Sequence, residues 1–127
     1  MKAGIINVTG YAGSELARLL WLHPEVELVS VTGRSAAGKR LPDVLPHLWN
    51  IDLQVTESIG NSIDIAFSAL PSGASAEVLA PMVESGVKAI DIAADFRLHS
   101  PEAYSRAYKN THPAPQLLAN AVYGLPE

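Results

Sequence analysis

The sequence predicts a doubly wound α/β domain built on a mainly parallel sheet. Three observations lead to this class. Short apolar runs alternate with helix-like segments, the first run ends in a glycine-containing turn that opens a helix, and no repeat or linker divides the 127 residues. Apolar residues make up 48% of the chain, enough to bury one core. We therefore expect a single domain over residues 1–127.

Continuous apolar runs are typical of strands that are buried on both faces of a sheet. The run at residues 3–8 ("AGIINV") is of this kind, and further strands are expected at residues 26–33 ("VELVSVTG"), 62–70 ("SIDIAFSAL") and 87–96 ("VKAIDIAADF"). A last strand is expected in "QLLANAVYG", residues 116–124. Because helical segments separate the runs, the strands are expected to be parallel.

The first two helical segments follow the first and third of these strands. In residues 13–25, Leu16, Leu19 and Leu20 predict one apolar face, and Pro24 ends the helix. In residues 75–86, Gly86 predicts the end of the helix, and Pro81 predicts either a kink or a late start.

Two further segments complete the pattern. Residues 100–109 predict a short helix with Ser100 as its N-cap and Pro101 in its first turn. Residues 34–50 contain two prolines and no clean period, so we expect a partly irregular excursion there.

Composition excludes several classes of function. The net charge of −4 argues against nucleic acid as a partner. No apolar run is long enough to span a membrane and no signal-peptide pattern follows the start, so we expect no membrane association and a cytoplasmic protein. The chain has no cysteine, and its four histidines show no metal-ligand spacing, so no thiol nucleophile and no metal site are expected.

The stretch "IINVTGYAGSEL", residues 5–16, resembles a dinucleotide-binding loop. Gly10 and Gly13 would let the backbone approach a pyrophosphate and present helix N–H groups to it. The first glycine of the common pattern is absent: Val8 or, in a longer variant, Asn7 stands there. Since asparagine tolerates positive φ, we expect the turn to survive. The alternative is an ordinary strand–helix connection that contains glycines.

The end of the second strand indicates which dinucleotide would bind. Chains that bind NAD place an acid there for the ribose hydroxyl, but this chain has Arg34 and Ser35, with Lys39 and Arg40 close behind. A guanidinium and a hydroxyl suit a 2′-phosphate, which predicts NADP(H) as the cofactor. The alternative is a solvated basic loop.

A series of motifs covers essentially all of the chain. In order they are "TGYAGSELARLL", "HPEVEL", "AGK", "PHL", "ALPSG", "DIAADFRL" and "YGLPE". This series resembles the amino-terminal, Rossmann-like NADP-binding part of the N-acetyl-γ-glutamyl-phosphate reductase family of arginine biosynthesis. The aminoadipyl-phosphate reductases of lysine synthesis are close relatives of that family, and aspartate-semialdehyde dehydrogenases are more distant ones.

The resemblance implies a reductive dephosphorylation. In the family a cysteine attacks a small-molecule acyl phosphate, phosphate leaves, and NADPH reduces the thioester to a semialdehyde. That cysteine lies just beyond the "YGLPE" motif, where this chain ends. We therefore expect a cofactor-binding part without its catalytic and dimerisation part, carrying no catalytic residue and inactive alone. The full-length protein is expected to be a homo-oligomer.

The resemblance also assigns candidate site residues. For the pyrophosphate loop they are Thr9, Gly10, Tyr11, Ala12 and Gly13; for the adenosine phosphate, Arg34 and Ser35; for the segment leading to the nicotinamide, Ser68, Leu70, Pro71 and Ser72; and for the substrate phosphate, Arg97. Asn7 departs from the family's usual glycine, and Arg97 could instead form a structural ion pair or capping contact.

The sequence also permits two other functions. The chain could belong to the lysine-pathway reductase, or to a non-catalytic module that senses NADP(H). We expect Asp91 to belong to a strand and Asp95 to hold a loop. Four aromatic side chains are expected to pack in the interior or along a helix face: Trp21, Trp49, Tyr104 and Tyr108.

Overall fold

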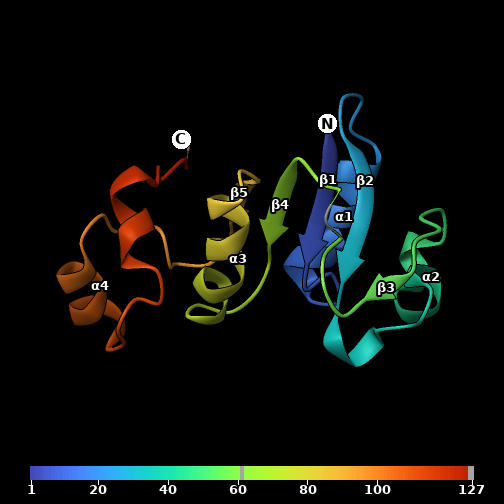
Figure 1. Ribbon diagram of the computed structural model, residues 1–127. Coiled ribbons are helices and arrows are strands. Elements are labelled where there is room, and N and C mark those ends of the chain that lie inside the picture. Colours follow the sequence, from blue (N-terminus) through green and yellow to red (C-terminus); the bar gives the residue numbers. More distant parts are fainter. Residues whose placement is uncertain (61, 126–127) are drawn as a thin grey trace.

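The chain forms a five-stranded sheet whose strands are all parallel, in the order β3-β2-β1-β4-β5 (Figure 1). The computed structural model describes residues 1–60 and 62–125. The strands are β1 (Lys2–Ile6), β2 (Glu27–Thr32), β3 (Val55–Thr56), β4 (Ile65–Ser68) and β5 (Lys88–Asp91).

Helices cover both faces of the sheet. The helices of the described residues are α1 (Tyr11–Trp21), α2 (Leu41–Val44), α3 (Ala74–Glu84) and α4 (Pro101–Tyr108), with short 3-10 turns η1 (Arg34–Ala36), η2 (Pro46–Leu48) and η3 (Pro115–Asn120). Helix α1 packs on β1 and β2 from one side, and α3 packs on β4 and β5 from the other (Figure 1). This arrangement confirms the predicted doubly wound, parallel α/β fold.

The core is divided by the sheet into two apolar clusters. Ile5 lies in the cluster on the α1 side with Ala17 and Leu20, and Ile6 lies in the other cluster with Leu79 of α3. Neighbouring residues of β1 can serve both clusters because successive side chains of a strand point to opposite faces. A strand that supplies both cores reads as a continuous apolar run, which is why β1 was predictable.

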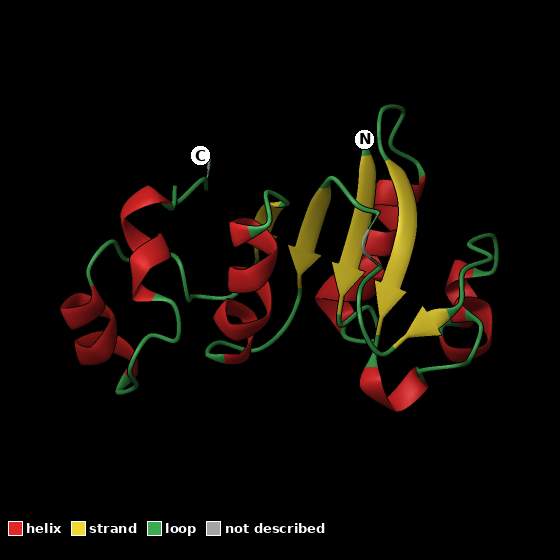
Figure 2. Ribbon diagram, in the orientation of Figure 1, coloured by secondary structure: helices red, strands yellow, loops and turns green. Residues whose placement is uncertain are grey.

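The parallel strands bring their carboxyl ends to one edge of the sheet, where the arrowheads of β1, β2 and β4 point the same way in Figure 2. After β1 the chain proceeds to β2 and β3 on one side, and it then returns to place β4 and β5 on the other side. The switch point of the topology therefore lies between β1 and β4, and ligands of such sheets bind outside the carboxyl ends at this point.

One sheet prediction was wrong, and one strand was missed. Residues 116–124 form no strand: η3 occupies Pro115–Asn120, and no strand follows it up to residue 125. Pro113 and Pro115 precede this run, each removing a backbone donor and fixing φ, which disfavours a ladder. Strand β3 was not predicted, because two residues are too few to show a period.

The predicted face of α1 was also partly wrong. Leu19 is 51% exposed, and the buried positions are Gly13, Ala17 and Leu20, with Leu16 at the border. These positions share a helical face through their spacing of four and three. Two of them are small, which lets α1 approach the sheet closely, so the buried face runs through this row and leaves Leu19 outside it.

Four further predictions concern caps, prolines and tryptophans. Ser100 caps α4 as predicted, its hydroxyl accepting from the Ala103 amide at 3.1 Å. A late start of α3 at Pro81 was wrong, since the helix begins at Ala74. Trp21 and Trp49 do not pack inside, since they are 40% and 78% exposed.

Candidate functional site

The turn after β1 is held in a left-handed conformation by an asparagine. Asn7 has a φ of 66°, which confirms the expected positive φ. Its backbone N–H donates to the Thr32 hydroxyl at 3.2 Å, and the next amide, of Val8, donates to the Thr32 carbonyl at 2.8 Å. The turn is therefore anchored to the end of β2.

Gly10 and Gly13 of this turn differ in whether the protein's own packing requires a glycine. A Cβ on Gly13 would collide with the Asn7 carbonyl oxygen and lie 2.8 Å from the Val8 Cα, so only glycine lets α1 lie this close to the end of β1. A Cβ on Gly10, the N-cap of α1, would meet only the Asn7 side chain at 3.6 Å and the Asn7 carbonyl at 4.0 Å. The packing of the protein itself does not require a glycine at position 10.

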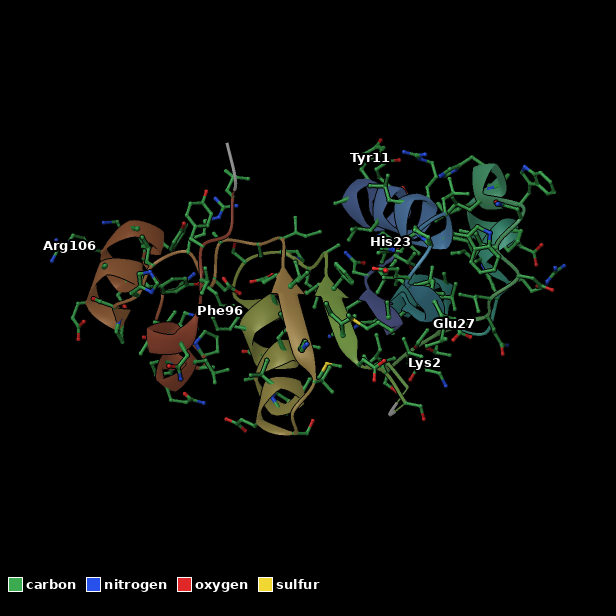
Figure 3. All side chains as sticks on the ribbon, turned by 90° about the horizontal axis from the view of Figure 1, so that it is seen from above. Lys2, Tyr11, His23, Glu27, Phe96 and Arg106 are labelled. Atoms are coloured by element: carbon green, nitrogen blue, oxygen red, sulfur yellow. The ribbon has the colours of Figure 1, made fainter. Side chains whose placement is uncertain are left out.

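The amino end of α1 is open. Its first turn contains no acidic residue, and within residues 1–60 and 62–125 no side chain accepts a hydrogen bond from the amides of Tyr11, Ala12 or Gly13. These N–H groups carry the positive end of the helix dipole. Tyr11 is 99% exposed and projects outward from the start of the helix (Figure 3). This end can accept an anion without displacing a protein group.

The end of β2 presents the predicted basic group. Arg34 and Ser35 lie exposed in η1, directly after the strand. Arg40 is separate, because its guanidinium donates to the Asp52 carboxylate at 2.9 and 3.1 Å, which raises the arginine pKa. The salt bridges of the described residues join Arg18 to Glu15 and Arg40 to Asp52, so Arg34 has no carboxylate partner there.

The loop after β4 forms the other side of the switch point. Ser68 is fully buried, and its hydroxyl lies 2.7 Å from the Ser75 hydroxyl, so its side chain serves the interior. Pro71 and Ser72 are exposed at the edge, with Leu70 half-buried beside them. The Ser72 hydroxyl accepts from the Ala94 amide at 3.3 Å, which links this loop to the loop after β5.

Asp95 closes the amino end of α3. Its buried carboxylate accepts from the Gly73 amide at 2.8 Å and from the Ala76 amide at 3.0 Å. The Tyr104 hydroxyl donates to the same carboxylate at 3.0 Å, and burial together with this hydrogen bond raises the pKa of Tyr104 to about 12. The prediction that Asp95 holds a loop is confirmed.

His112 joins this buried cluster and packs edge-to-face with the Tyr104 ring, with ring centroids 4.7 Å apart. The Ala114 amide donates to Nδ1 of His112, so the neutral ring carries its proton on Nε2, which donates to the Asp95 carbonyl at 2.8 Å. Tyr104 packs against Tyr108 with ring centroids 4.9 Å apart, as the helical spacing predicted. The described part of the chain contains no cluster of three or more histidine, aspartate or glutamate side chains that could hold a metal ion.

Asp91 ends β5, as predicted. Only one of its two carboxylate oxygens has hydrogen-bond partners among the described residues. One carboxylate oxygen accepts from the Ser75 hydroxyl at 2.6 Å and from the Ala93 amide at 3.0 Å. The other oxygen is buried and has no hydrogen-bond partner among the described residues. Burial raises the pKa of this carboxyl. The role of Ser75 was missed, because nothing in the sequence marks which α3 serine turns inward.

Arg97 follows β5 by six residues and is exposed. Its guanidinium stands 6.0 Å from the Tyr123 ring centroid, and both residues line a cavity of about 820 Å³ with Asp91 and Asn120. The ion pair with Asp95 that the sequence left open does not form, because the Asp95 carboxylate is used by α3 and Tyr104. Arg97 is exposed and has no ion pair within the described residues.

A doubly wound parallel sheet, a glycine turn at its switch point and an open helix end define the class of dinucleotide-binding domains. The family model described as "Semialdehyde dehydrogenase, NAD binding domain" matches residues 2–127, and the chain belongs to this family. No helix of the described residues has the length and apolar character needed to cross a membrane.

Individual relatives agree with this family. The chain is 58% identical over 126 residues to an N-acetyl-gamma-glutamyl-phosphate reductase of Dehalococcoides mccartyi, covering 99% of this chain and 37% of that protein. It is 46% identical to the protein of the same name from Heliobacterium modesticaldum, covering 100% of this chain and 38% of the relative. The chain thus spans well under half the length of these relatives.

A solved structure is similar as well. The crystal structure of aspartate semialdehyde dehydrogenase with NADP from Candida albicans superimposes with a TM-score of 0.65 at 25% identity. The match covers 88% of this chain and 40% of that one.

Proposed function

We propose that this chain is the NADP-binding part of a reductase that converts N-acetyl-γ-glutamyl phosphate to N-acetylglutamate semialdehyde and phosphate in arginine biosynthesis. The observation that carries the nucleotide site is the open amino end of α1 behind a glycine turn at the switch point. The substrate is supported by the 58% identity to a reductase of that name.

The pyrophosphate is proposed to bind at the start of α1. The loop Thr9–Gly13 would hold it through the amides of the first helical turn, where the helix dipole favours negative charge. Because the protein does not need a glycine at position 10 for its own packing, the absence of a side chain there supports a close approach of the pyrophosphate to the backbone.

The adenosine end is proposed to carry a 2′-phosphate. Arg34 stands exposed at the end of β2 without a carboxylate partner in the described residues, and Ser35 follows it. An arginine offers paired donors to phosphate oxygens, whereas an acid at this position would repel them. This supports NADP(H) over NAD(H).

The nicotinamide is proposed to lie along the loop after β4, beside Leu70, Pro71 and Ser72. Ser68 would support this loop from the interior rather than through its buried hydroxyl. Arg97, exposed and unpaired in the described part, would hold the substrate phosphate.

The bound cofactor would supply a hydride, which the substrate accepts after phosphate has left. None of the 127 residues is a cysteine, so these residues bind and orient the nucleotide but do not supply a thiol nucleophile. We extend the proposal to the complete enzyme, which would be a cytoplasmic homo-oligomer. Light scattering of the full-length protein would check the oligomeric state.

A parallel titration of the purified chain with NADPH and NADH tests the nucleotide site. Nicotinamide fluorescence should show tighter binding of NADPH. Arg34→Ala should weaken NADPH binding by about tenfold or more, through the loss of charge-assisted hydrogen bonds, and leave NADH nearly unchanged.

Arg106→Ala is the matched control, since this exposed arginine of α4 lies at one end of the molecule, well away from Tyr11 (Figure 3). It removes the same charge and should change neither affinity. Equal losses for both nucleotides in Arg34→Ala would contradict the 2′-phosphate contact. Absence of binding by the folded wild-type chain would contradict the nucleotide site itself.

A further inference from the structure

Asn7 joins two loops that are far apart in the sequence. Its side-chain amide donates from Nδ2 to the Ala69 carbonyl at 2.9 Å, across a separation of 62 positions. The Ala69 amide in turn donates to the Ile6 carbonyl at 3.0 Å. The first residue after β4 is therefore bound at both its backbone groups to the end of β1.

The side chain of Asn7 takes the place of a missing backbone donor. Ile6 pairs with Ser68 in the β1–β4 ladder, and the even spacing of parallel bonds would next direct the Val8 amide to the Ala69 carbonyl. The Val8 amide instead donates to Thr32 of β2 at 2.8 Å, because the left-handed residue before it turns the backbone away from β4. The Asn7 amide fills the vacated position.

We propose that Asn7 is a positioning residue that sets the separation of the two loops flanking the nucleotide crevice before the nucleotide binds. One loop carries Gly10 and the open end of α1, and the other leads from Ala69 into Leu70–Ser72. Fixing both in advance lowers the cost of ordering them on binding. This inference rests on the proposed nucleotide-binding function of the crevice.

The comparison with glycine makes the role testable. A glycine at position 7 supplies the positive φ of the turn but no donor for Ala69, so it separates the backbone requirement from the link. An aspartate has the same shape and also tolerates the left-handed region, but it presents an oxygen to the Ala69 carbonyl.

The experiment compares Asn7→Gly and Asn7→Asp with the wild-type chain. Nucleotide-free hydrogen exchange of the Ala69, Leu70, Ser72 and Gly73 amides reports on the loop that the link holds, and NADPH titration reads the effect of the link on binding. We expect faster exchange in this segment for both variants and dissociation constants about 3- to 10-fold larger, the range that one lost hydrogen bond represents. Asn50→Gly, in an exposed turn, is the control for an added glycine and should change neither readout.

Each outcome of this experiment tests a different part of the proposal. Wild-type exchange at residues 69–73 in both variants would overturn the link, and faster exchange with an unchanged NADPH dissociation constant would overturn the positioning role. If Asn7→Gly fails to fold, hydrogen exchange in Asn7→Asp still tests the link, and its NADPH affinity is compared at high salt, where repulsion between the new carboxylate and the pyrophosphate is screened. If the folded wild type binds neither NADPH nor NADH, the proposed function and with it the positioning role fail, while the exchange measurement still reports on the link.

Discussion

Helices α1 and α3 begin at the same edge of the sheet, each after a glycine, and each has 11 residues. They differ in what meets their first amides. At α3 the Asp95 carboxylate accepts from the Gly73 and Ala76 amides, whereas at α1 no side chain of the described residues takes this place. The protein fills one positive helix end with its own carboxylate and leaves the other open.

This difference teaches where an anion can bind. Both ends offer backbone donors and a dipole, so the helix by itself does not choose between them. A second negative group at α3 would be repelled by Asp95 and would find its amides already bound. Under the proposed function, the selection of α1 for the pyrophosphate would therefore be made by Asp95, a residue from the loop after β5.

The largest expected effect comes from removing the carboxylate that closes the amino end of α3. Asp95→Ala leaves the Gly73 and Ala76 amides and the Tyr104 hydroxyl without their acceptor in a buried place. We expect the free energy of unfolding to fall by about 3–4 kcal/mol, measured by urea denaturation. Asp52→Ala, which removes an exposed carboxylate paired with Arg40, is the control and should change little. Similar losses in the two variants would contradict the capping role.

A second prediction tests the open end of α1 by substituting its two glycines one at a time. Gly13→Ala forces a Cβ against the backbone at the end of β1 and should lower the free energy of unfolding by about 1–3 kcal/mol. Gly10→Ala places a Cβ in ordinary contact with Asn7 and should leave stability nearly unchanged, yet weaken NADPH binding about tenfold by blocking the backbone. Thermal unfolding and NADPH titration of both variants check this. The reverse pattern would show that Gly10 is a structural glycine.

The smallest effect concerns the pH dependence beside α3. Burial raises the pKa of Asp91, so folding favours its protonated form, and its contribution to stability decreases as the pH rises through its raised pKa from the unfolded value of about 3.9. Asp91→Asn removes this term, so the variant should gain stability relative to wild type between pH 3 and pH 7. Urea unfolding at several pH values measures the difference, with exposed Asp43→Asn as the control. A constant difference across this range would count against the buried carboxyl.

Much of the candidate site was predictable because its causes are local. The positive φ of Asn7 follows from a strand that must turn into a helix, and the cap of α4 from Ser100 before Pro101. The wrong predictions concern which apolar side chains are buried. Leu19 and Trp49 are apolar yet exposed, and periodicity alone does not say which of two possible helix faces meets the sheet.

The sequence by itself determined the strand–turn–helix pattern, the basic group after β2 and the absence of a thiol, because these depend on neighbouring residues or on composition. Only the tertiary structure decided that Asn7 meets Ala69 and that Asp95 meets Gly73. Such pairs join loops from different strands. Their meeting depends on strand order and register, which are set by the packing of the whole sheet rather than by any local run of residues.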